Sequence, residues 1–78
     1  MSDFAIGMHV VRVVRLDESG RSTIVELWLA AVPRERAVLA VREAIPADWD
    51  AEITDQRLTR DHVARLGIRA GEVRKLTS

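Results

Sequence analysis

The sequence predicts a small single domain of the α+β class, with elements in the order ββαβαβ. Three observations support this prediction: two valine-rich runs flank a turn sequence, two prolines bound a helical pattern, and an alternating segment precedes a short capped helix. A chain of 78 residues builds one core. We therefore treat residues 1–78 as one domain. We expect residues 1–7 to be flexible, since only Phe4 and Ile6 offer apolar anchors there.

The two valine-rich runs, residues 8–16 and 22–31, predict a β-hairpin because they are rich in β-branched residues and are separated by a glycine-containing turn. If residues 17–21 form the loop, Arg12 lies directly opposite Glu26. Opposed charges of this kind help to fix the register of a strand pair. We therefore interpret Arg12 as the partner of Glu26 and not as a phosphate ligand.

The remaining elements follow from start and stop signals. A helix is expected over residues 34–44, between the two prolines. Strict alternation in residues 49–54 predicts a half-buried strand. Thr59 suits an N-cap and Gly67 a helix stop, which together predict a short second helix. Residues 72–77 predict the last strand.

These elements predict a four-stranded sheet, mixed or antiparallel, with one main helix and one short helix. Their order along the chain resembles that of β-grasp domains. This is a likeness of arrangement that no sequence motif accompanies.

On the expected register, both faces of the hairpin are apolar. The main helix spans about 16 Å and covers one face, whereas the short helix spans about 12 Å against strands of about 30 Å. The second face therefore needs another cover. We expect a homodimer, because exposed apolar patches mark interfaces and short domains gain stability by association. Closure of this face within one chain, by loops and termini, remains the alternative. The residues expected at the interface are Val10, Val14, Ile24, Trp28 and Leu39.

Charge is balanced overall, with 12 Lys and Arg against 12 Asp and Glu, so the chain has no net attraction for polyanions or acidic membranes. The distribution is uneven: residues 43–56 contain acidic but no basic side chains, and residues 57–75 are mainly basic. One interpretation is that the two segments neutralise each other. The other is a basic patch for nucleic acid or an acidic partner. Its members would be Arg57, Arg60, Arg65, Arg69, Arg74 and Lys75.

Few residues suggest chemistry. The chain has no cysteine, which excludes disulfides and thiolate ligands. His9 and His62 fall on different elements, and the acidic run lacks the glycine and terminal glutamate of an EF-hand loop, so we expect no metal site and no cofactor. Nucleotide-binding motifs and clustered catalytic groups are also missing, so we expect no enzymatic activity.

The N-terminus carries Asp3 where a secretory signal would be basic. No apolar run approaches the roughly eighteen residues of a membrane-spanning helix. We therefore expect a cytoplasmic protein without a membrane partner. The leading hypothesis is a non-catalytic protein-interaction module that binds itself, or another protein, through an apolar hairpin face. The alternative is a nucleic-acid-binding or regulatory protein that uses the basic segment 57–75, and a steep salt dependence would distinguish it.

Overall fold

The computed structural model describes residues 7–76, and it confirms the α+β class and the predicted order of elements. The four strands form one antiparallel sheet in the order β3-β1-β2-β4. Apart from Gly7, the segment expected to be flexible lies outside the described residues. The elements are β1 (His9–Leu16), β2 (Thr23–Ala30), α1 (Arg34–Ala44), β3 (Asp50–Ile53), α2 (Arg60–Leu66) and β4 (Val73–Lys75).

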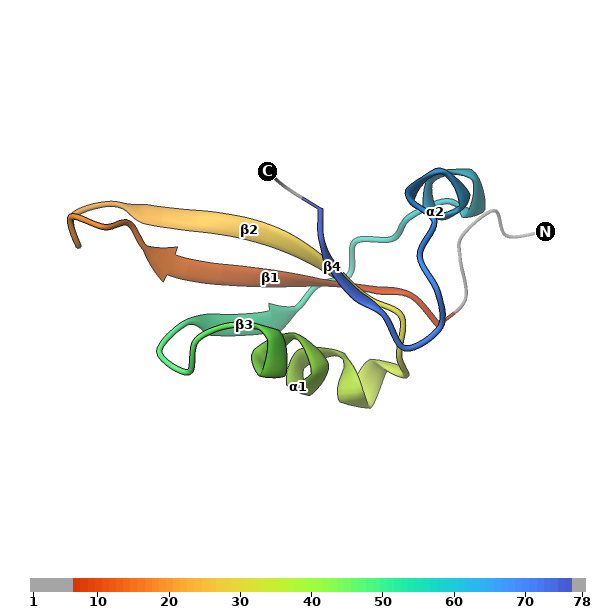
Figure 1. Cartoon of the computed structure of the whole chain (residues 1–78), viewed down its shortest axis with the longest axis horizontal. Coiled ribbons are helices and arrows are strands. Elements are labelled where there is room, and N and C mark those ends of the chain that lie inside the picture. Colours follow the sequence, from red (N-terminus) through yellow and green to blue (C-terminus); the bar gives the residue numbers. More distant parts are fainter. Residues whose placement is uncertain (1–6, 77–78) are drawn as a thin grey trace.

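The two helices lie on opposite faces of the sheet (Figure 1). We call these the α1 face and the α2 face. The main core lies under α1, where Ala37 and Val41 pack against Val11 and Val13 from β1. A smaller core lies under α2 and the segment before it, where Leu58 packs against Val10 and Leu29. The hairpin extends beyond α2 toward its own loop.

The predicted helix signals are confirmed. α1 has the predicted bounds. At the start of α2, the Thr59 hydroxyl accepts a hydrogen bond from the backbone N–H of His62 at 3.2 Å. At its end, Gly67 takes a left-handed conformation with φ of 66°, which a residue with a side chain adopts only at a cost.

The hairpin register differs by one residue from the prediction. Arg12 pairs with Leu27, not with Glu26, so the expected opposition of these two charges is wrong. The loop is the physical reason, because it spans residues 17–22 in place of 17–21. The N–H of Asp17 donates to the carbonyl of Ser22 at 2.9 Å. This bond closes a six-residue loop, so Leu16 pairs with Thr23 and not with Ser22.

A shift of one residue moves every side chain of a strand to the opposite face of the sheet. Trp28 is therefore on the α1 face, directly opposite Val11, and Ile24 lies on the same face. The prediction had placed both with Val10 and Val14, which are on the α2 face. Trp28, one of the residues expected at the interface, therefore packs on the face that α1 covers.

The second core supplies a stability test. Leu29→Ala is expected to lower the free energy of unfolding by about 2–5 kcal/mol, because the leucine is fully buried and its removal leaves a cavity. Leu39→Ala changes the same side chain at a site that is 59% exposed, and it should alter stability by no more than about 0.5 kcal/mol. Urea unfolding followed by tryptophan fluorescence measures both. Equal losses in the two variants would contradict this assignment of the core.

Candidate interaction surface

α2 covers only one end of its face of the sheet. Its Val63 and Leu66 pack around Val10 and Leu29, at the end of the hairpin away from the loop. A helix of this length spans about 10 Å, whereas β1 runs for about 27 Å. The part of the α2 face nearer the loop therefore has no helix over it.

We call this uncovered part the open hairpin face. It consists of Val14, Leu16, Val25 and Leu27, which share the α2 face of β1 and β2 according to the register. Leu16 is 61% exposed and Val25 is 50% exposed, while Val14 and Leu27 are half-buried. Within residues 7–76 only one other large apolar side chain, Leu39, is as exposed. An apolar cluster left open in this way is a candidate binding surface.

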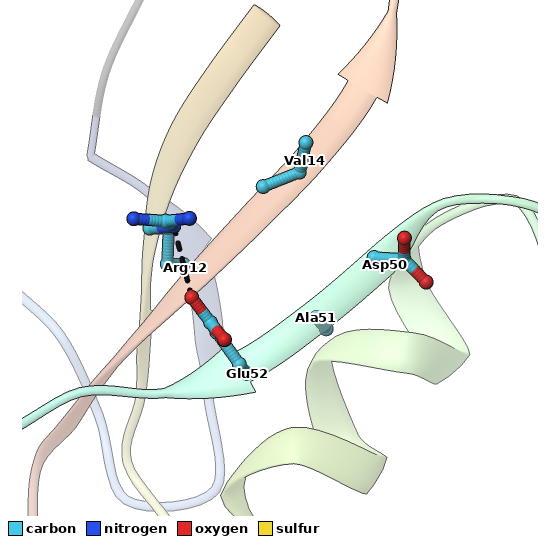
Figure 2. A pocket seen from close by; sticks show the side chains of 5 residues that line it. All are labelled: Arg12, Val14, Asp50, Ala51 and Glu52. Atoms are coloured by element: carbon cyan, nitrogen blue, oxygen red, sulfur yellow. Dashed lines mark ion pairs between the residues drawn. The ribbon is translucent and has the colours of Figure 1, made fainter. Parts of the chain in front are cut away.

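A hollow of about 420 Å³ adjoins the open hairpin face, between β1 and β3. Its lining residues are shown in Figure 2: Arg12, Val14, Asp50, Ala51 and Glu52. Arg12 and Glu52 are opposed across the two strands, with 3.0 Å between Nε and Oε1. Both are well exposed to solvent, so this ion pair contributes little to stability.

Glu26, the predicted partner of Arg12, is instead buried on the α1 face. Its carboxylate lies 3.0 Å from Arg15 Nε and 3.2 Å from Lys75 Nζ, and it accepts a hydrogen bond of 3.1 Å from the indole N–H of Trp28. Burial raises the pKa of this carboxyl, but the three donors outweigh it and hold the pKa below its ordinary value. The Arg15 guanidinium also lies over the Trp49 ring at 4.9 Å. This cluster closes the α1 face beside the helix.

The structure does not bring the predicted interface residues together. Val10 is buried beneath α2, and Ile24 and Trp28 lie on the α1 face. Leu39 is on the exposed side of α1. Of the predicted set, Val14 alone belongs to the open hairpin face.

Sequence reasoning missed Val25 and Leu27 because the register error placed them on the other face. The residues around Asp17 carry a signal for the longer loop. The Asp17 carboxylate accepts hydrogen bonds from the Ser19 hydroxyl at 2.6 Å and from the N–H of Ser22 at 3.5 Å. An Asp with a Ser two residues later is typical of Asx-type turns, in which the Asp side chain accepts a hydrogen bond that a backbone carbonyl would otherwise accept. The opposed charges of Arg12 and Glu26 favour the shorter loop, so the two sequence signals conflict.

The predicted basic patch is divided between the two faces of the sheet. Lys75 is on the α1 face, where it pairs with Glu26. Arg74 is on the α2 face, where it forms an ion pair of 2.6 Å with Glu72 and donates to the carbonyl of Leu66. The latter bond caps the end of α2 and ties it to β4. The arginines that remain lie on α2 and in its flanking loops: Arg57, Arg60, Arg65 and Arg69.

The acidic segment pairs with partners that were not expected. Glu52 pairs with Arg12 of β1, and Asp55 lies 3.7 Å from Arg34 at the start of α1. Both arginines belong to the first half of the chain, so these two pairs do not join the acidic segment to the basic C-terminal one.

Within residues 7–76, no three His, Asp or Glu side chains gather where they could hold a metal ion. His9 is near Arg34, and its pKa is lowered first by burial and then by that arginine. In the same part of the chain, no helix has the length and apolar character to cross a membrane.

Comparisons with models of known families, with curated proteins and with solved structures found no match. The geometry of the open hairpin face is therefore the basis for assigning a role.

The buried carboxylate gives a pH-dependent prediction. Glu26→Gln is expected to lower the free energy of unfolding at pH 7 by about 1–3 kcal/mol, because three donors lose a charged acceptor. The folded-state pKa of Glu26 is depressed, so its contribution is present above the ordinary pKa of 4.5 and is lost as the pH falls through the folded-state value. Urea unfolding at several pH values measures this difference.

The matched control is Glu18→Gln, an exposed carboxyl in the hairpin loop, which should change stability by less than about 0.5 kcal/mol. The difference in the free energy of unfolding between the wild type and Glu26→Gln should become smaller as the pH is lowered. A difference that stays constant with pH contradicts the role given to the Glu26 charge.

Proposed function

We propose that this chain is a non-catalytic protein-interaction module that self-associates through the open hairpin face. The observation that carries the proposal is the exposure of Leu16 and Val25 on a surface that neither helix covers. Each copy of the chain presents the same surface. A twofold contact therefore buries both surfaces at once and closes the assembly as a dimer.

The charges beside the open hairpin face favour one arrangement of two copies. A twofold axis parallel to the strands stacks the two sheets about 10 Å apart with opposite strand order. The acidic side chains of β3, Asp50 and Glu52, then lie over the uncharged side chains of the partner's β2. An axis perpendicular to the strands would stack β3 on β3 and oppose like charges. The parallel axis is the one that we propose.

The size of the surface sets the strength of this contact. Residues 12–16 and 23–27, with β3 beside them, cover about 17 Å by 14 Å, or roughly 240 Å² in projection. A standard interface buries about 800 Å² on each partner. We therefore propose a weak dimer that forms at high protein concentration, as in transient signalling contacts.

The non-catalytic part of the proposal rests on the positions of the titratable groups. Among residues 7–76, the groups with pKa values shifted from the ordinary ones include His9, Asp17 and Glu26. They occupy the start of β1, the hairpin loop and the middle of β2, so they do not converge as an acid and a base do at an active site. A cysteine-free chain suits a reducing compartment, and we propose a cytoplasmic location.

Leu16→Lys tests the dimer. With the parallel axis over β1, the Leu16 side chains of the two copies face each other, so the substitution opposes two like charges, at a position exposed enough to tolerate the charge in the monomer. Light scattering behind size exclusion should be run from about 10 μM to 1 mM, because interfaces below about 1,200 Å² are weak. The wild type should show a mass that rises with concentration toward twice the monomer, and the variant should remain monomeric.

Leu39→Lys is the matched control, since it changes an equally exposed apolar residue on α1. It should associate as the wild type does. A wild type that stays monomeric throughout, or a Leu39→Lys variant that alone loses association, contradicts the proposal. Association that weakens steeply with salt would instead favour a charge-driven contact such as the nucleic-acid alternative.

A further inference from the structure

The hollow between β1 and β3 lies at an open edge of the sheet. Among the described residues 7–76, β3 pairs with β1 alone and has no strand on its other side. The N–H of Thr54 donates to the carbonyl of Val10 at 3.1 Å, and backbone groups of successive residues point to opposite sides of a strand. The N–H and C=O groups of Ala51 and Ile53 therefore point away from β1. Within residues 7–76, no turn, loop or side-chain hydrogen bond engages them.

The side chains around the hollow suit a basic side chain. Asp50 is exposed and has no ion pair with another residue of the described part of the chain. Val14 lines the β1 side of the hollow, so Asp50 lies between it and the free edge of β3. Figure 2 shows Glu52 directed at Arg12 on one side of the hollow, with Asp50 separate from that pair.

We propose that the β3 edge and the hollow bind an extended, basic segment of another protein, which adds a strand to the sheet. The backbone of the segment pairs with the outward N–H and C=O groups of Ala51 and Ile53. A lysine or arginine of the segment lies at the hollow on the same face as Asp50, with its charge beside that carboxylate. Backbone pairing supplies affinity in this mode of recognition, and the side-chain site supplies specificity.

Charge selects this occupant over a second copy of the chain. Two β3 strands paired edge to edge would place Asp50 and Glu52 next to the same residues of the partner, and like charges in neighbouring strands are destabilising. Exposed edges are commonly protected from self-pairing by short length and charge. β3 has both properties, and its negative charge leaves the edge open to a cationic strand.

This site is separate from the proposed dimer contact, although both include Val14. Peptide binding is therefore measured on dilute protein, where light scattering shows a monomer. A Leu16→Gln variant, which removes an apolar side chain of the dimer contact without adding a charge, should bind the peptide as the wild type does. A protein that stays monomeric can therefore still bind the peptide, and a protein that does not bind the peptide can still dimerise.

The probe is a capped peptide of sequence Thr-Arg-Val-Arg-Val-Arg-Thr, titrated into isotopically labelled protein and followed by NMR. The amide signals of Ala51 and Ile53 should shift, and their hydrogen exchange should slow, because their N–H groups become donors to the added strand. Asp50→Asn should weaken binding about two- to fivefold, as expected for an exposed ion pair. Asp48→Asn removes a carboxylate that does not line the hollow, and it should leave binding unchanged.

Two control peptides separate strand addition from charge attraction. One replaces a valine with proline, which removes a backbone N–H but keeps all three arginines, and it should weaken binding about tenfold or more. The other replaces each arginine with glutamate and should not bind. Equal binding of the proline and parent peptides, equal effects of Asp48→Asn and Asp50→Asn, or unshifted Ala51 and Ile53 signals would each overturn the proposal.

Discussion

The shape of this protein depends on one mismatch, between a hairpin that is apolar on both faces and a chain that has only one long helix. α1 and the Glu26 cluster cover one face. α2 closes the other face only where Val10 and Leu29 lie, and it is held there by its contacts with them and by the cap that Arg74 gives its last carbonyl. The open hairpin face is what remains. It is a consequence of helix length, and its exposed side chains are those that α2 is too short to reach.

The two proposed surfaces occupy neighbouring parts of the sheet but differ in chemistry. The open hairpin face is apolar and uncharged on β2, which suits a second copy of the same surface. The β3 edge has unpaired backbone groups and carboxylates, which suit an extended cationic segment and oppose self-pairing. Because Val14 borders both, an occupant of one surface influences the other. A strand added at β3 would also widen the sheet that a second copy covers.

Local signals were enough to predict most of the fold, whereas the register depended on contacts distant in sequence. The bounds of α1 and the caps of α2 follow from Pro33, Thr59 and Gly67, whose preferences are properties of single residues. The hairpin register does not, because both registers leave apolar residues on both faces. The charges of Arg12 and Glu26 favour the wrong register. The actual partners of Glu26 include Lys75, which is distant in the sequence, and the sequence alone does not indicate that these two residues pair. The lengths of the elements were enough to predict that the short helix cannot cover its face of the sheet. They were not enough to predict which residues this leaves exposed, because that depends on the register.

The most direct test of this account is methyl NMR with a soluble paramagnetic agent, which broadens the signals of methyl groups that solvent reaches. In dilute protein, the methyl groups of Leu16 and Val25 should broaden strongly, while those of Val10 and Leu29 should be protected. At high concentration, Leu16 and Val25 should become protected as well, because the second copy excludes the agent. Equal protection of all four residues in dilute protein would mean that one chain closes its own sheet, and it would contradict the account.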